Sequence, residues 1–194
     1  MGKYASFADL AEHETYGLDF CVRHCDRPGS PVAILAPHGG LIEAGTSEIA
    51  GLIASDDHSL FCFEGLKGRG RNRELHITSH RFDHPVCLAL AAGREIVLSV
   101  HGCMGHAQIF LGGLDVQFTH RLAHEFGAAG FDVVSDGHRY PGRHPMNICN
   151  RGLRGKGAQL EITYDLRAPR HRHSLAAAAR AAIAAFSGSL RRSA

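Results

Sequence analysis

The sequence predicts an α/β layered fold whose central sheet is mostly parallel or mixed. Short segments rich in Val, Ile, Leu and Phe alternate along the chain with segments of helical length, which is the pattern of a sheet covered by helices. The segments 32–36 and 95–100 are apolar almost throughout, as expected of strands covered on both faces. With 194 residues, 44% of them hydrophobic, the chain can bury one sizeable core.

The individual elements follow from this alternation. Eight strands are predicted: Leu18–Val22, Val32–Ala36, Ser59–Phe63, Leu75–Thr78, Glu95–Val100, Gln108–Leu111, Phe131–Ser135 and Ala158–Tyr164. Four helices are predicted: Thr46–Ala54, Asp83–Ala92, Leu114–Ala128 and Leu175–Phe186. Asp83 is a suitable N-cap for the second of them. The basic segment 167–173, which contains a proline, is expected to be a linker into the last helix.

Composition excludes several classes of protein. The net charge is +2, from 21 basic and 19 acidic residues, so charge alone does not indicate a polyanionic partner. The six cysteines form no C-x-x-C pair, which argues against a cysteine-rich zinc site and favours a reducing compartment. No signal peptide and no apolar run of about 18 residues is found. We therefore expect a cytoplasmic protein without a membrane segment.

Two strands end in the same way. The segment Val32–Pro37 runs into His38-Gly39, and Glu95–Val100 runs into His101-Gly102. Open α/β sheets bind ligands beyond the carboxyl ends of their strands, so neighbouring strands would bring these two imidazoles together. With 15 histidines in the chain, such spacing is more informative than any single histidine.

Glu43 follows His38 by five residues across a Gly-Gly turn, which can return a carboxylate to the imidazole. His38, Glu43 and His101 would then form a set of two histidines and one carboxylate, the kind that holds a catalytic zinc and leaves a position open for water. Iron or manganese would also suit these ligands. The alternative is two hydrogen-bonded histidines and a solvated Glu43.

A hydrolytic zinc site also needs a general base. Glu161 lies in the middle of the strand 158–164, on the face opposite Leu160 and Ile162. Glu161 is the candidate base. The alternative is an edge strand with one solvent-exposed face, on which Glu161 would simply be a surface residue. Glu64 at the end of 59–63 is a rival. Cys103, directly after His101-Gly102, is a candidate thiol nucleophile, and no G-x-S-x-G elbow is present.

Basic, glycine-rich loops are suited to carboxylate or phosphate groups. One is Lys67–Arg73 and the other is Arg143–Lys156. The segment Leu75–His80 could line a pocket with hydroxyl and imidazole groups. Each of these segments could equally be a solvated loop or an ordinary polar strand.

The same segments resemble a known family. Their order and spacing are similar to those of the phage-type poly-γ-glutamate hydrolases, over roughly residues 14 to 167; the similar segments are Ala36–Glu43, Gly45–Glu48, Phe63–Gly65, Leu75–Ser79, Ser99–Gly102, Asn147–Gly152 and Gln159–Ile162. The resemblance implies an open three-layer α/β/α fold related to the zinc carboxypeptidases. It also implies hydrolysis of γ-glutamyl amide bonds in poly-γ-glutamate.

The resemblance implies roles for individual residues as well. His38, Glu43 and His101 would be the ligands of one zinc ion and Glu161 the general base. Arg151, Asn147, Arg143 and Lys67 are the candidates for binding substrate carboxylates. Residues 1–167 would form the catalytic domain, and 168–194 the basic linker and Ala-rich helix, which has no counterpart in the resemblance.

Two other functions stay open. A zinc amidohydrolase or peptidase acting on another γ-glutamyl or peptide substrate would use the same residues. A non-enzymatic protein that binds a polyanion would use the basic loops, although sparse aromatic residues make nucleic acid an unlikely partner. The sequence does not predict the oligomeric state.

Overall fold

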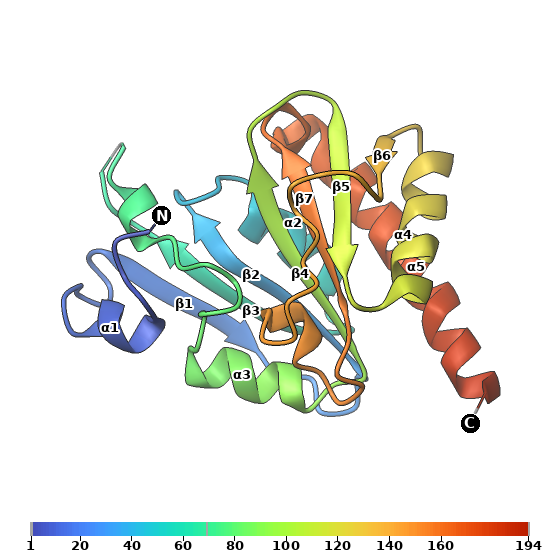
Figure 1. Cartoon of the computed structure of the whole chain (residues 1–194), viewed down its shortest axis with the longest axis horizontal. Helices are drawn as coiled ribbons and strands as arrows, with labels where there is room; N and C mark the ends of the chain where they lie inside the picture. Colours follow the sequence, from blue (N-terminus) through green and yellow to red (C-terminus); the bar gives the residue numbers. More distant parts are fainter. Residues whose placement is uncertain (1, 69, 194) are drawn as a thin grey trace.

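The computed structural model describes residues 2 to 68 and 70 to 193 and contains a seven-stranded mixed sheet flanked by helices (Figure 1). Arg69, in one of the basic loops, lies outside the described residues. The strands are β1 (Phe20–Cys25), β2 (Val32–Gly40), β3 (Ser59–Gly65), β4 (Ile96–Cys103), β5 (Gln108–Gly113), β6 (Asp132–Val134) and β7 (Ala158–Thr163). The helices are α1 (Phe7–Ala11), α2 (Thr46–Ala54), α3 (Pro85–Ala92), α4 (Val116–Ala128) and α5 (Pro169–Ser193).

The strand order is β1-β3-β2-β4-β7-β5-β6. The central strands β3, β2, β4 and β7 are parallel. β1 runs antiparallel to β3, and β5 runs antiparallel to β7 but parallel to β6. The predicted mixed sheet is therefore confirmed. The two strands that end in His-Gly, β2 and β4, are direct neighbours, so their carboxyl ends lie side by side.

Two hydrophobic cores on opposite faces of the sheet make the fold three-layered. Along β2, Ile34 packs into the core under α2, α4 and α5, while the next residue, Leu35, packs into the core under α1 and α3. This alternation is why strands covered on both faces read as continuous apolar runs. No described helix is long and apolar enough to cross a membrane.

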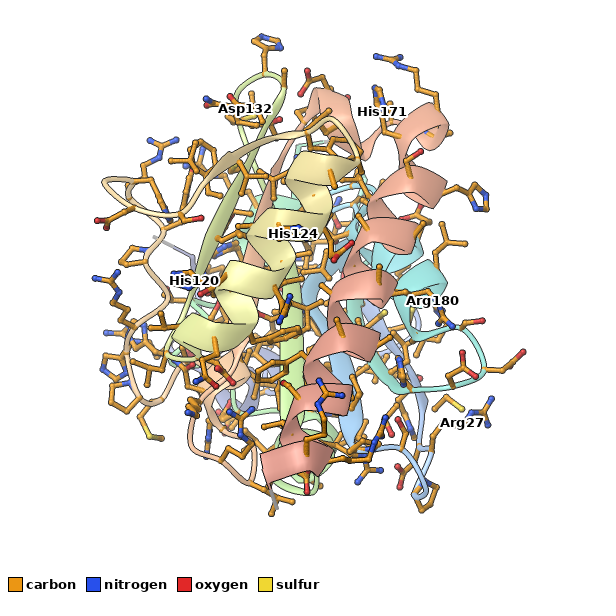
Figure 2. All side chains as sticks on the ribbon, turned by 90° about the vertical axis from the view of Figure 1, so that its right-hand side faces the viewer. Arg27, His120, His124, Asp132, His171 and Arg180 are labelled. Atoms are coloured by element: carbon orange, nitrogen blue, oxygen red, sulfur yellow. The ribbon has the colours of Figure 1, made fainter. Side chains whose placement is uncertain are left out.

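The C-terminal region differs from the prediction. The segment expected to be a linker continues from residue 169 into α5, a single 25-residue helix. Its buried face, which includes Leu175, Ile183 and Phe186, belongs to the main core, and the Phe186 ring stacks on Phe118 of α4 at 4.9 Å. Figure 2 shows α4 and α5 side by side across this face of the sheet. The basic residues of 170–173 are therefore exposed or half-buried positions of a packed helix, and their charge hid the start of the helix in the sequence.

The segment 75–78 was expected to be a strand, and this expectation is wrong. Residues Asn72–Leu75 form a 3₁₀ turn, and an extended loop follows. The alternation seen in the sequence is real, because Leu75 and Ile77 are fully buried. However, the carbonyl oxygen of Ile77 lies 2.6 Å from Nε2 of His38 and forms no bond in a strand ladder. The loop is therefore held by a side chain of the site.

Smaller differences concern the ends of elements and one missed helix. α1 was not predicted, because its five residues are too few for a periodic pattern. At α3 the N-cap is His84, whose Nδ1 accepts from Val86 N, whereas the expected N-cap Asp83 instead accepts from the amide of Phe7 at 2.6 Å. α2 has the predicted bounds, Thr46–Ala54.

Candidate metal centre

Two imidazoles meet at the carboxyl ends of β2 and β4. His38 and His101 are both buried, and their Nδ1 atoms lie 3.1 Å apart. A tetrahedral ion with zinc–nitrogen bonds of about 2.0–2.1 Å separates two nitrogen ligands by about 3.3 Å. The spacing of the imidazoles is therefore that of two ligands of one ion.

The turn after β2 brings a carboxylate to the same point. Gly40 has a φ of 60°, a conformation that favours glycine, and the amide of Glu43 donates back to the carbonyl of His38 at 3.0 Å. Oε1 of Glu43 lies 3.2 Å from Nδ1 of His38, and Oε2 lies 3.9 Å from Nδ1 of His101. The backbone amide of Gly102 donates to Oε2 at 2.7 Å, which fixes the carboxylate.

The outer nitrogens of both imidazoles are held by the protein. Nε2 of His38 faces the Ile77 carbonyl, which can only accept, so this nitrogen donates its hydrogen and a neutral His38 presents the Nδ1 lone pair to the cluster. Nε2 of His101 lies 3.2 Å from the hydroxyl of Ser99. Two inward lone pairs beside a carboxylate, each imidazole fixed from behind, are the arrangement that binds a divalent cation. The donor set therefore fits zinc.

The electrostatics of the cluster also favour a cation. Burial lowers the pKa of His101 to about 3, and the neighbouring His38 contributes in the same direction, so His101 stays neutral. Burial tends to raise the pKa of Glu43, but His38 outweighs it and holds this pKa below its usual range. Glu43 in turn raises the pKa of His38, so the carboxylate stabilises a proton on this imidazole, whereas His101 stays neutral. A divalent cation bound beside Glu43 would replace that proton.

His76 is a third imidazole at this point. Its ring stacks on that of His38 at 3.9 Å, and Nε2 lies 3.5 Å from Oε1 of Glu43. Ligand atoms of His38, Glu43 and His76 all lie within 4.8 Å of one another, so His76 is a second way of completing the set. The sequence indicated only that the 75–80 segment could line a pocket. Ile77 is buried on one side of this extended segment, so the neighbouring His76 side chain points to the other side, toward the site. The alternation of apolar and polar residues in 75–78 is the signal that could have found His76.

Glu161 lies beside the cluster in the interior of the sheet. β7 runs between β4 and β5, and Glu161 is paired in register with His101 on one side and Phe110 on the other. The open possibility of an edge strand is therefore excluded. Burial raises the pKa of Glu161 to about 8, and the charge of Glu43 raises it further in the same direction. The rival Glu64 faces elsewhere and lies 3.4 Å from Arg23.

These groups open into a cavity of about 570 Å³, which we call the site cavity. Its wall includes His38, Glu43, His76, Thr78, Ser79, His80, His101, Gly102, Cys103, Met104, Arg139, Tyr140, Pro141, Gly142, Arg143, His144, Asn147, Gln159 and Glu161. The thiol of Cys103 is part of this wall, and burial raises its pKa to about 11, which disfavours the nucleophilic thiolate.

Of the four residues suggested for substrate binding, the structure brings Arg143 and Asn147 to the site cavity. The Asn147 amide is engaged within the protein, because Nδ2 donates to Gln159 at 2.8 Å and Oδ1 accepts from the amide of Cys149. The described residues of the cavity wall do not include Arg151 or Lys67. Lys67 is buried, and its ammonium group lies 2.6 Å from Glu14 and 3.2 Å from Glu74.

Sequence reasoning missed Arg139. It lines the site cavity, and its Nε donates to the hydroxyl of Tyr140 at 2.8 Å. The segment around it has no periodicity that would place it, and only the fold shows which way it faces. The loop is oriented by the side chain of Gln159 in β7, whose Nε2 donates to the Tyr140 carbonyl at 3.3 Å.

Solved structures with the same fold include enzymes. The structure of a bacteriophage poly-gamma-glutamate hydrolase superposes with a TM-score of 0.92 at 26% identity, covering 97% of this chain and 99% of that chain. A structure described as zinc-free YndL gives a TM-score of 0.77 at 35% identity, covering 86% of this chain and 82% of that one. A putative carboxypeptidase A from Shewanella denitrificans, 14% identical with a TM-score of 0.52 over 84% of this chain and 59% of that one, shares the fold alone.

Sequence comparison agrees with the structural match. The UPF0714 protein YndL of Bacillus subtilis is 42% identical over 170 residues, which cover 84% of this chain and 65% of that protein. The chain thus spans slightly less than two thirds of this relative. The pattern of the poly-gamma-glutamate hydrolase family matches residues 4–185, which includes the site and most of α5. The chain belongs to the poly-gamma-glutamate hydrolase family.

Proposed function

We propose that the protein is a zinc-dependent hydrolase that cleaves the γ-glutamyl amide bonds of poly-γ-glutamate. The observation that carries the proposal is the cluster of His38, Glu43 and His101 beside the buried Glu161, in a chain that belongs to this family. A zinc-free form of a 35% identical relative supports the choice of metal. Family membership favours a hydrolase over a polyanion-binding protein without activity.

In the proposed site, His38, Glu43 and His101 hold the zinc ion and His76 stacks on His38 from the solvent side. Zinc, when bound, supplies Lewis-acid chemistry: it polarises a carbonyl group and lowers the pKa of water to about 7. Gly102 N–H and the Ile77 carbonyl keep Glu43 and His38 in orientation throughout the reaction.

Glu161 is the proposed general base. Its carboxylate accepts a proton from the attacking water, whose oxygen adds to the amide carbon, and then gives this proton to the nitrogen as the carbon–nitrogen bond breaks. Its pairing in register with His101 in the sheet supports this role. A nearby cation lowers the raised pKa of such a carboxylate, which favours the ionised form that a general base needs.

The proposed substrate accounts for the two arginine side chains in the wall of the site cavity. In a γ-linked polymer every unit keeps its α-carboxylate, so a carboxylate stands next to each scissile nitrogen. Arg139 and Arg143 line the site cavity and are exposed, so they can pair with these groups through their planar guanidinium forks. Arg139 is the first choice for the unit at the scissile bond, because its Nε already positions Tyr140 in the cavity wall.

The test is hydrolysis by the full chain loaded with zinc. Poly-γ-glutamate and α-linked polyglutamate are incubated separately, and chain length is followed by gel filtration. We expect the γ-linked polymer to be shortened, and the shortening to stop with a chelator or with Glu161→Gln. Unchanged polymer in the zinc-loaded enzyme would refute the proposal, and equal cleavage of the α-linked chain would indicate a broader amidohydrolase.

A further inference from the structure

A second cavity, of about 240 Å³, lies next to the site cavity, beneath the start of α4; we call it the α4 cavity. The end of β5, the first turns of α4 and the loop 135–143 form its wall. Pro141 and Arg143 line both cavities, so the two hollows meet at these residues. A polymer chain in the site cavity that continues past Arg143 can therefore reach the α4 cavity.

The loop that separates the two cavities is fixed in place. Nε2 of His138 lies 2.9 Å from the Leu111 carbonyl, and the amide of Tyr140 donates to Nδ1 of His138 at 3.2 Å, so both ring nitrogens are engaged. The amide of Gly113 donates to the Pro141 carbonyl at 2.9 Å. The α4 cavity is therefore formed before any ligand binds, which lowers the ordering cost of binding.

The side chains left for a ligand in the α4 cavity are suited to an anion. Arg143 is two-thirds exposed, and His120 on α4 adds an imidazole; Figure 2 shows His120 on α4. The Thr119 hydroxyl also lines the cavity, but it donates to the Val116 carbonyl at 2.9 Å. Asp136 is the one carboxylate among the described residues of the wall, at 3.8 Å from Arg143. Both partners of this pair are mostly exposed, so it is weak and a ligand carboxylate can replace it.

We propose that the α4 cavity is a subsite for the polymer chain that occupies the site cavity. It would hold a glutamyl unit of that chain that extends beyond the site cavity, and Arg143 would bind the α-carboxylate of this unit. The inference rests on the proposed function for the identity of the polymer. Its consequence is a preference for length: oligomers that reach past Arg143 gain contacts that shorter ones do not. Asp136 opposes this binding, since it competes for Arg143 and repels the ligand.

The experiment measures binding of γ-linked glutamate oligomers of increasing length to zinc-loaded Glu161→Gln protein by calorimetry. We expect affinity to rise with length and to reach a plateau. Arg143→Ala should reduce the ratio of long-chain to short-chain affinity by about fivefold, the loss of one charged hydrogen-bonded contact at an exposed site. Asp136→Asn should raise the same ratio.

Two matched pairs of variants separate a subsite from general attraction. Arg121→Ala removes an equal charge from α4 outside both cavities, and should leave the ratio at its parental value. Thr119→Glu places a carboxylate in the α4 cavity and should lower the ratio, whereas Gln117→Glu places one on the same helix outside it. Equal effects within each pair, or affinity independent of length, would overturn the inference. Because binding is measured apart from turnover, an enzyme that binds long oligomers but cleaves none would contradict only the proposed function.

Discussion

The guanidinium group of Arg167 packs against Gly102, the residue that follows His101 in β4. Arg167 is buried, with Nη1 donating to the Ala44 carbonyl at 2.7 Å and Nη2 to the Cys103 carbonyl at 3.3 Å. It thus joins the loop before α2 to the end of β4. The amide of Gly102 in turn donates to Glu43, so the arginine supports the strand end that orients a proposed ligand.

A side chain at position 102 should disrupt this arrangement. A Cβ there would overlap the Arg167 guanidinium, so Gly102→Ala must displace a buried charge that is bonded to two carbonyls. We expect a loss of about 2–3 kcal/mol in the free energy of unfolding and weaker zinc binding. Gly127→Ala in α4 is the control, since nothing lies within 4 Å of the added atom and alanine favours a helix. Equal unfolding midpoints for the two variants would show that Gly102 is not needed.

Ser99 should affect the affinity for zinc without contacting the ion. The residue is fully buried, and its hydroxyl lies 3.2 Å from Nε2 of His101. Outer hydrogen bonds of this kind change metal affinity by about 10- to 100-fold, so Ser99→Ala should weaken zinc binding about tenfold. Ser79→Ala, at 3.5 Å from the same nitrogen, should have a smaller effect. Competition with a fluorescent chelator measures both affinities, and an unchanged affinity in Ser99→Ala would exclude this role.

Glu161 should make the metal-free protein less stable as the pH rises. Its pKa is about 8 in the fold and about 4.3 in an unfolded chain, so between these values the folded state binds more protons. The free energy of unfolding therefore falls from about pH 4.5 to pH 8, by a few kcal/mol, and Glu161→Gln removes this decline. Urea unfolding of chelator-treated protein at several pH values measures it. Parallel pH profiles for the parent and the variant would refute the prediction.

Lys67 should contribute to stability and not to the site. It is buried between Glu14 and Glu74, and Lys67→Met leaves the buried Glu14 with one cationic partner fewer. Breaking a buried pair costs about 3–5 kcal/mol, so we expect a clear loss of stability with unchanged zinc affinity. The Michaelis constant of the folded variant is the decisive measurement. A large rise in this constant would place Lys67 in substrate binding after all.

The parts of this structure that the sequence predicts are those set by local pattern. α2 has the predicted bounds, and the strands that carry His38 and His101 lie where their apolar runs place them, although each extends a few residues further. Periodicity works there because each strand alternates between two cores, and a helix has one buried face.

Long-range contacts explain what the sequence could not predict. The 75–78 segment alternates like a strand, but an imidazole from β2 takes its carbonyl bond. Lys67 is a basic residue in a glycine-rich loop, and only the fold reveals that the loop after α1 brings Glu14 to it. Arg139 enters the site cavity because Gln159 and His138 hold its loop. Each outcome depends on a partner far away in the chain.

Zinc binding by single-residue variants tests the metal centre most directly. The full chain and the variants His38→Ala, Glu43→Ala, His101→Ala, His76→Ala and Glu161→Gln are loaded with zinc, dialysed, and assayed for bound metal and for cleavage of poly-γ-glutamate. We predict one zinc per chain in the parent, none in the first three variants, and a full complement without turnover in Glu161→Gln. His76→Ala should keep its zinc. A protein that retains zinc in His38→Ala, Glu43→Ala and His101→Ala alike would contradict the proposed ligand set.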